Sequence, residues 1–174
     1  PHNDEQGVFH PRAVDVNTKT GHIYAAAAYS HRIDRFTPDG EFEFSVGGVN
    51  KEPDILNKPR NITADPDNGN LYVSSRRDHI IRRFTSEGEP QPSFVPDAGD
   101  LSEYDASWRY QAIVQFPGPI EFDNDGKIWM MRQGYHYPDD PTPDDYLRSY
   151  NKDGEFQGFL DNEKLIDYME GFDI

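Results

Sequence analysis

The amino-acid sequence predicts an all-β repeat fold, because one pattern of residues returns along the chain at a fixed spacing. Each member of the pattern comes back 48 positions later, which is the separation of Pro11 and Pro59. A period of about 40 to 50 residues is typical of architectures that stack one small unit several times. The first copy holds Pro11, Arg12, Gly21, Tyr24, Ile33, Arg35, Phe36, Thr37 and Gly40, and the second holds Pro59, Arg60, Gly69, Tyr72, Ile81, Arg83, Phe84, Thr85 and Gly88.

Each unit predicts four short strands joined by turns. In the first unit, residues 32–36 alternate polar and apolar side chains, as a half-buried strand does. Residues 17–21 and 38–40 contain the Asn, Asp and Gly that tight turns favour. The strands expected in this unit are 12–16, 22–27, 32–36 and 42–46.

The second and third units follow the same order. The third is longer, because 25 positions separate Trp129 from Gly154 where 16 separate Tyr24 from Gly40. It therefore carries an insertion of nine residues, centred on 135–146. The expected strands are 59–64, 70–74, 80–84 and 91–95 in the second unit and 120–122, 127–131 and 147–150 in the third, where a turn at 151–154 leads to Phe156.

Four antiparallel strands with a turn at each step correspond to one blade of a β-propeller, and each blade buries its faces against its neighbours. The expected blades are about 9–48, 57–96 and 116–160, with 161–174 starting a further blade or capping the last one. Three blades leave two open sheet edges, which favour association. We therefore expect a fragment of a longer propeller, or a ring that is completed by another chain such as a second copy.

The motif within each unit resembles the NHL repeat, whose family forms six-bladed β-propellers. The resemblance rests on a proline before a hydrophobic strand, an Ile-Tyr pair, a His-Arg-Ile segment and an Asp-Gly-Glu-Phe turn. In the first unit these are Pro11, Ile23-Tyr24, His31-Arg32-Ile33 and Asp39-Gly40-Glu41-Phe42. The resemblance covers residues 9–160 and implies an NHL-type partial propeller over 1–174.

The charge of the chain narrows its possible partners. With 32 acidic and 17 basic residues, the net charge of the 174 residues is −15. Nucleic acids and acidic membrane surfaces are unexpected partners, because both require a basic surface. The acidity suits a soluble protein in a salty or extracellular setting, so we expect a secreted chain in an extracellular or periplasmic location. No cysteine is present, so disulfides and thiolate chemistry are excluded.

One branch of the resemblance is enzymatic, the peptidyl-hydroxyglycine amidating lyases. That family binds zinc in the central channel through histidines that directly follow the proline opening certain blades. Here the corresponding residues are Arg12 and Arg60, and the third unit offers Gly118 or Ile120. Guanidinium groups stay protonated and do not ligate zinc. The resemblance therefore implies no zinc triad within these three units.

Tyr29 is the one catalytic candidate. The same enzymes carry a tyrosine shortly before an Asn-x-Arg-Ile segment, and Tyr29 precedes the similar segment 30–33 with one residue fewer. The alternative is a loop tyrosine that packs over its own blade.

Arg12, Arg60 and His10 form a candidate anion-binding site. If both arginines face the channel, they make a local positive region that holds a carboxylate or phosphate by bidentate hydrogen bonds. The alternative is that each arginine pairs with an aspartate, such as Asp15 or Asp65, and only stiffens the centre of the ring.

The acidic turns allow a calcium prediction, because Asp and Asn oxygens at alternate positions suit that ion. The candidates are Asp65, Asp67, Asp123 and Asp125, although the repeat register already explains these residues as turns. His31 and His79 occupy equivalent places in successive units, too far apart to share a metal.

The insertion is the candidate interaction loop. Insertions in repeat proteins often form the binding face, and this one carries Tyr135, His136, Tyr137 and Tyr146. The alternative is an acidic loop without a partner.

Taken together, the sequence favours a non-catalytic binding or scaffold module that engages protein partners or a small anionic ligand and needs no cofactor. One alternative is a metal-dependent lyase or hydrolase, using zinc or calcium held partly by further blades. The other is a structural role in which three-bladed chains assemble as homo-oligomers or with larger partners.

Overall fold

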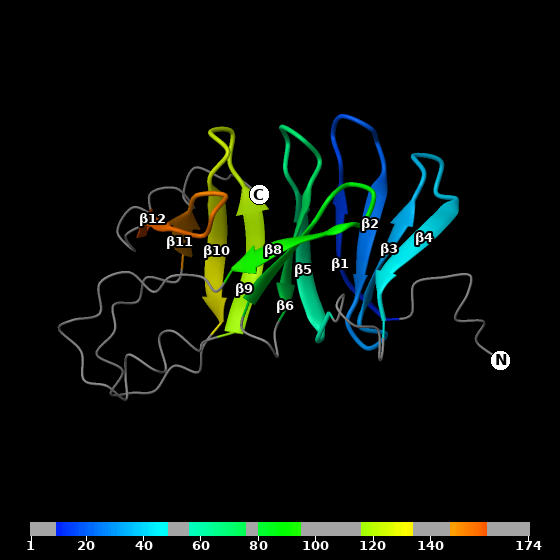
Figure 1. Cartoon of the computed structure of the whole chain (residues 1–174), viewed down its shortest axis with the longest axis horizontal. Helices are drawn as coiled ribbons and strands as arrows, with labels where there is room; N and C mark the ends of the chain where they lie inside the picture. Colours follow the sequence, from blue (N-terminus) through cyan, green and yellow to red (C-terminus); the bar gives the residue numbers. More distant parts are fainter. Residues whose placement is uncertain (1–9, 49–55, 76–79, 95–115, 134–146, 160–174) are drawn as a thin grey trace, which may run out of the picture.

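The computed structural model describes residues 10–48, 56–75, 80–94, 116–133 and 147–159, which form three four-stranded antiparallel sheets (Figure 1). In each sheet the strands lie side by side in the order of the sequence. The predicted all-β fold of four-stranded units is confirmed. The strands are β1 (Pro11–Val16), β2 (Ile23–Ala27), β3 (Arg32–Phe36) and β4 (Phe42–Gly47) in the first sheet, β5 (Pro59–Ala64), β6 (Leu71–Ser75), β7 (Ile80–Phe84) and β8 (Pro90–Phe94) in the second, and β9 (Phe116–Phe122), β10 (Ile128–Gln133), β11 (Leu147–Tyr150) and β12 (Phe156–Phe159) in the third.

The largest difference from the expected strands is at β9, which begins at Phe116, four residues before Ile120. Pro117 and Pro119 obscured this start, because proline cannot donate to a ladder of hydrogen bonds. Since β9 is an edge strand of its sheet, it pairs only with β10 and tolerates both prolines.

The part of the chain that the structure describes contains no helix long and apolar enough to cross a membrane.

The first turn of each sheet is built by one polar side chain. We call the first strand of each sheet (β1, β5 and β9) its inner strand. An Asn or Asp directly after the inner strand accepts a hydrogen bond from the backbone N–H two residues later, which fixes the turn. These bonds are Lys19 N to Asn17 Oδ1 (3.0 Å), Asp67 N to Asp65 Oδ1 (2.9 Å) and Asp125 N to Asp123 Oδ1 (2.9 Å).

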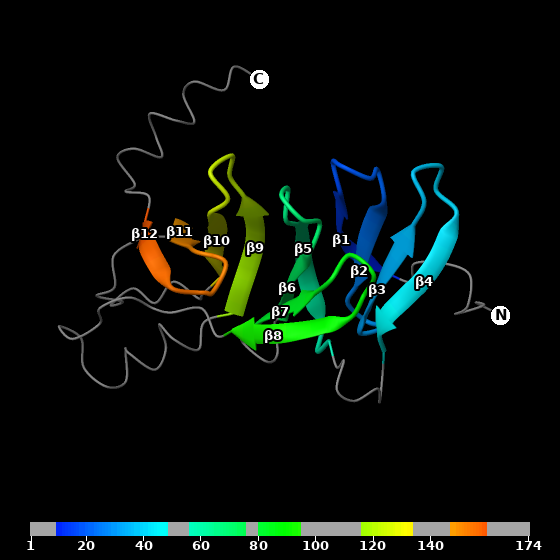
Figure 2. The same ribbon diagram turned by 45° about the horizontal axis from the view of Figure 1, so that its top comes forward.

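The three sheets stand side by side with β1, β5 and β9 as neighbours (Figures 1 and 2). The second sheet gives one face to each of two separate apolar cores, so it is stabilised by both of its neighbours, as in repeat proteins. The first core contains Tyr24, Ala26, Ile33, Val46, Leu56, Ile62, Leu71, Val73 and Phe84, and the second contains Tyr72, Ile81, Ile120, Ile128, Met130 and Tyr150.

A tyrosine and an arginine make the polar contact between the first and second sheets. Tyr24 on β2 lies opposite Arg35 on β3, and both side chains donate to the Ser86 carbonyl oxygen, at 3.2 and 2.8 Å respectively. The Arg35 guanidinium also lies 2.9 Å from Glu87 and 2.8 Å from Glu43. Burial raises the pKa of Tyr24 despite the nearby Arg35 charge, so its hydroxyl stays a donor. We call this arrangement the Tyr–Arg latch.

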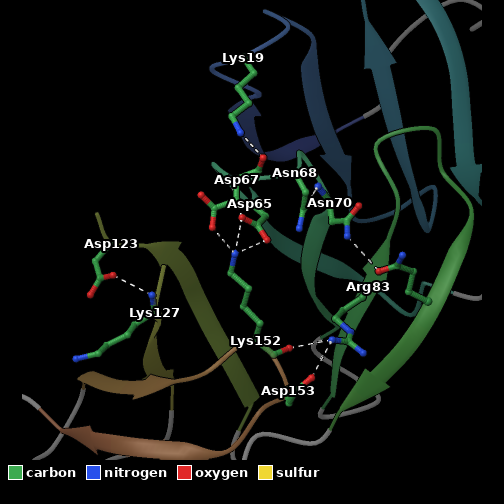
Figure 3. A network of polar contacts seen from close by, with 11 residues as sticks. Lys19, Asp65, Asp67, Asn68, Asn70, Arg83, Asp123, Lys127, Lys152 and Asp153 are labelled. Atoms are coloured by element: carbon green, nitrogen blue, oxygen red, sulfur yellow. Dashed lines mark hydrogen bonds and ion pairs between the residues drawn. The ribbon is translucent and has the colours of Figure 1, made fainter. Parts of the chain in front are cut away.

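The arginine contact of the latch recurs between the second and third sheets (Figure 3). Tyr72 lies opposite Arg83, and Arg83 Nη1 donates to the Lys152 carbonyl oxygen at 2.9 Å and lies 4.0 Å from Asp153 Oδ1. In both latches the acceptors belong to the turn between the third and fourth strands of the following sheet. The 48-residue repeat therefore encodes a contact between sheets as well as the sheets themselves.

The turn that receives each latch also packs tightly against the preceding sheet. Gly88 has a φ of +86°, and a Cβ atom at this position would lie 2.5 Å from Val46 Cγ2 and 3.0 Å from Phe44. Gly154 is in similar contact with the ring of Phe94. The equivalent Gly40 has a φ of +85° but no atom within 4 Å of such a Cβ.

Lys152 adds an ion pair between the second and third sheets (Figure 3). Its Nζ lies 2.8 Å from Asp65 Oδ2 and 2.9 Å from Asp67 Oδ2. The Asp65 side chain is fully buried, whereas that of Lys152 is 32% exposed. Burial alone lowers the pKa of Lys152, but the two carboxylates outweigh it and raise this pKa. The hydrogen bond from Lys152 lowers the pKa of Asp67.

We expect Gly88→Ala to be more destabilising than Gly40→Ala. Both substitutions strain a backbone with positive φ, but only the first also forces a methyl group into Val46 and Phe44. Overpacking of this kind costs about 1–3 kcal/mol, so the free energies of unfolding in urea should differ by that amount. Equal losses in the two variants would show that the turn does not pack against the first sheet.

We expect Lys152→Met to lower the free energy of unfolding by about 1.5–3 kcal/mol at pH 7, because the buried Asp65 carboxylate loses its charged partner. Lys127→Met, at an exposed lysine of a neighbouring turn, is the control for charge. The double variant Asp65→Asn/Lys152→Met should recover part of the loss.

The pH dependence of this loss follows from the two pKa shifts. The raised pKa of Lys152 means that its contribution is present below its unfolded pKa of about 10.4 and disappears as the pH rises through the folded value. The lowered pKa of Asp67 means that its contribution is present above about pH 3.9 and disappears as the pH falls through the folded value. The difference between wild type and Lys152→Met should therefore be greatest between these limits. A difference at pH 2 as large as at pH 7 would contradict the ion pair.

Candidate functional site

Basic side chains line a small pocket where the first and second inner strands begin. The pocket has a volume of about 80 Å³, which exceeds the roughly 30 Å³ that one water occupies in the liquid. It therefore has room for one carboxylate or phosphate group. We call it the cationic pocket, and it is lined by Arg12, Ala28, Tyr29, Lys58, Pro59 and Arg60.

Tyr29 lies at the centre of the basic side chains. It follows β2 and is 55% exposed. Its ring centroid is 5.8 Å from Arg12 Cζ and 5.7 Å from Lys58 Nζ, within the range of cation–π attraction. The His10 ring meets it edge-on at 5.3 Å. The Tyr29 ring thus contacts two cations and a histidine.

A β-bulge places each arginine. The pairing of β1 with β2 shifts between Pro11 and Ala13, and the pairing of β5 with β6 shifts between Pro59 and Asn61. The extra residues are therefore Arg12 and Arg60. A bulge re-aims one side chain without ending the strand, and bulges are common beside functional sites.

The residues before the two prolines carry backbone strain. His10 and Lys58 have φ values of 54° and 56°, and His31 nearby has 55°. Non-glycine residues in this region cost on the order of 1–3 kcal/mol each and cluster at functional sites. His31 also contacts the Leu56 carbonyl oxygen through Nδ1 at 3.1 Å, which ties the first sheet to the segment that enters the pocket.

Two cations of the pocket have no acidic partner among the residues that the structure describes. Within the described residues, neither Arg12 nor Lys58 contacts a carboxylate, and their recorded contacts are those with Tyr29. The aspartates considered as partners for the arginines are engaged elsewhere. Asp15 accepts a hydrogen bond from Ala64 N at 2.7 Å, and Asp65 binds Lys152.

The structure brings Arg12, Arg60, His10 and Tyr29 together at one site, although the sequence presented Tyr29 and the arginines as separate candidates. Sequence reasoning missed Lys58. The repeat could have found it, because Lys58 lies 48 positions after His10 and precedes Pro59 as His10 precedes Pro11.

The opposite ends of the inner strands are acidic. A cavity of about 270 Å³ lies there, lined among others by Asp15, Asp67, Glu121 and Asp123. Partial burial of the Glu121 carboxyl group raises its pKa, and the Asp15 charge raises it further, against the hydrogen bond from Thr63 (3.1 Å). The inner strands therefore run from a basic end to an acidic end.

The residues considered for calcium have other contacts. Asp65 and Asp67 bind Lys152, while Asp123 Oδ1 holds its own turn and Asp123 Oδ2 accepts a hydrogen bond from Trp129 Nε1 at 2.8 Å. Asp125 is exposed in the same turn. Within the described ranges, no group of three or more His, Cys, Asp or Glu side chains is placed to hold a metal.

Several predicted residues lie outside the described parts of the chain. These are His79 and the interaction loop with Tyr135, His136, Tyr137 and Tyr146. The segment 161–174 lies outside them too.

Comparison with known proteins establishes the fold. No protein-family model matches the sequence, and no curated protein matches it. Among solved structures, the chain is similar to the hydrazine synthase of Kuenenia stuttgartiensis, with a TM-score of 0.60 and 11% identity over 87% of this chain and 36% of that chain. It is also similar to a streptogramin B lyase, with a TM-score of 0.58 and 16% identity over 93% of this chain and 43% of that one.

A third similar structure contains the WD40 repeats of RRP9, with a TM-score of 0.60 and 11% identity over 90% of this chain and 40% of that chain. WD40 repeats form propellers of four-stranded blades. At these identities the likeness concerns the fold alone. The chain spans 36% to 43% of the length of these three solved chains. Its three sheets are thus blades of a partial β-propeller.

Proposed function

We propose that this chain is part of an NHL-type propeller that acts as a non-catalytic binding module. Its cationic pocket would receive a carboxylate or phosphate group of a small molecule or of a partner protein. The observation that supports this most directly is the grouping of Arg12, Lys58 and Arg60 around Tyr29 in a chain of net charge −15.

The chemistry of the lining favours an anion. Like charges brought together repel one another, and an anionic group between them relieves that repulsion. Arginine matches carboxylate and phosphate with two parallel hydrogen bonds, and lysine adds a mobile charge. Arg12 and Lys58 contact no carboxylate of the described residues, and this supports an anion as their partner.

The rest of the chain limits which anions fit. A strongly acidic protein repels distant anions, so extended polyanions such as nucleic acids gain nothing from the field of the whole molecule. A compact anionic group that reaches the pocket is attracted only over a few ångström. The ligand is therefore expected to be small, or to be one acidic group on a larger partner.

A metal-dependent lyase or hydrolase is the second candidate. It is favoured by the position of Tyr29 inside the pocket, beside His10, where a hydroxyl group could act on a bound ligand. Its metal would be zinc or calcium held partly by other blades. Stoichiometric zinc or calcium in the purified protein would support this candidate against a simple binding module.

We expect the chain to bind citrate, used as a probe with three carboxylates, in a titration calorimeter at low salt. The double variant Arg12→Gln/Lys58→Gln should bind at least tenfold more weakly, because it loses two of the charges around the pocket. The control Lys19→Gln/Lys127→Gln removes the same charge from exposed turn residues and should keep the wild-type affinity.

Two outcomes would contradict the proposal. Wild-type protein that binds neither citrate nor inorganic phosphate would exclude an anion site of useful strength. Equal weakening in the pocket variant and the control would mean that the binding follows net charge and not the pocket.

A further inference from the structure

We propose that the first sheet is a docking surface for another propeller blade, one that carries a Tyr–Arg pair on its second and third strands. The surface consists of the exposed side chains of Val14, Val16 and Phe42 together with the turn Pro38–Gly40. We call it the open face.

The repeat shows what normally covers this face. Val14 on β1, Ile62 on β5 and Ile120 on β9 are equivalent, since each lies two residues before the last residue of its strand. Ile62 is 2% exposed and Ile120 is 1% exposed, because each packs against the sheet that precedes it. Val14 is 65% exposed. In the second and third sheets a preceding sheet covers this apolar position, whereas in the first sheet the same position is exposed.

The turn of the first sheet offers the acceptors of a latch. The Ser86 and Lys152 carbonyl oxygens accept from Arg35 and Arg83, and Pro38 is the equivalent residue. Glu87 and Asp153 supply the carboxylates of the two observed latches. Asp39 is their equivalent and is exposed. Among the described residues, no side chain donates to the Pro38 carbonyl or pairs with the Asp39 carboxylate.

The turn glycine gives an independent indication. At Gly88 and Gly154, a Cβ atom would collide with the fourth strand of the preceding sheet. Gly40 keeps the same positive φ, yet no atom lies within 4 Å of such a Cβ. The turn therefore has the shape for close contact with a preceding blade, and the space for that blade is open.

The third sheet of a second copy does not carry the required pair. Tyr24 faces Arg35 and Tyr72 faces Arg83, but the equivalent residues of the third sheet are Trp129 and Ser149. The serine hydroxyl is used within its own sheet, where it donates to the Gly158 carbonyl at 3.2 Å, and the indole N–H is held by Asp123. We therefore infer that the occupant is a blade with Tyr and Arg at these places, and not a third sheet from an unaltered copy of this chain.

The test introduces the Tyr–Arg pair into the third sheet, and we call the resulting proteins donor variants. In the full chain, Trp129→Tyr/Ser149→Arg should tighten self-association at least tenfold over wild type, measured as the dissociation constant by sedimentation equilibrium. The single variant Ser149→Arg, which keeps the Trp129–Asp123 hydrogen bond, is a second version of the donor in case the double variant does not fold. Circular dichroism and a cooperative thermal transition establish folding in each case.

Three controls make the result specific. Gln157→Arg places the same charge on an exposed residue of β12 and should leave the association unchanged. Adding Val14→Asp or Gly40→Val to the donor variant should abolish the gain, because both alter the open face. Folded donor variants that associate no more tightly than Gln157→Arg would overturn the proposal, as would a gain that survives Val14→Asp. Wild type that associates as tightly as the donor variant would overturn the choice of occupant, because the third sheet would then fit as it stands.

Discussion

The arginine that reaches from one sheet to the turn of the next is the contact on which the rest of the structure depends. Apolar cores hold the sheets together, but such cores are non-directional and tolerate sliding. The bonds from Arg35 to Ser86 and from Arg83 to Lys152 fix how far each turn lies along the preceding sheet. The bond from Arg35 thereby helps to set the relation between the starts of β1 and β5, where the pocket forms. The pocket is a consequence of stacking, since neither sheet alone supplies Arg12, Lys58 and Arg60.

The repeat made most of the fold predictable, because period, turn residues and strand alternation agreed in the first two units. The sequence did not reveal the start of β9, because the two prolines on this edge strand make its first residues look like a loop. It also did not reveal the bulges at Arg12 and Arg60, which depend on pairing with a partner strand and leave no mark on the residue pattern. The arginines were identified as site residues, but their grouping with Tyr29 and Lys58 depends on how two sheets pack. The repeat pattern predicts each sheet separately and does not predict how the side chains of two sheets come together.

The first and third sheets differ from the second in ways that the shared motif conceals. The second sheet has a neighbour on both faces and buries both, whereas the first leaves Val14, Val16 and Phe42 exposed. The third replaces the Tyr–Arg pair by Trp129 and Ser149 and holds its tryptophan internally through Asp123. The departures from the repeat therefore fall in the two sheets that each have one neighbouring sheet among the described residues.

The inner strands have a basic end and an acidic end, so the charge of the described residues is unevenly distributed along them. Three residues of β1 separate Arg12 from Asp15, or roughly 10 Å, which is about one screening length at 0.1 M salt, so the two ends remain electrostatically distinct. A positively charged matrix or surface would attract the end that carries Asp15, Asp67, Glu121 and Asp123. The chain would then be held with Tyr29 and its surrounding cations turned toward the solution, which gives an immobilised protein a preferred orientation.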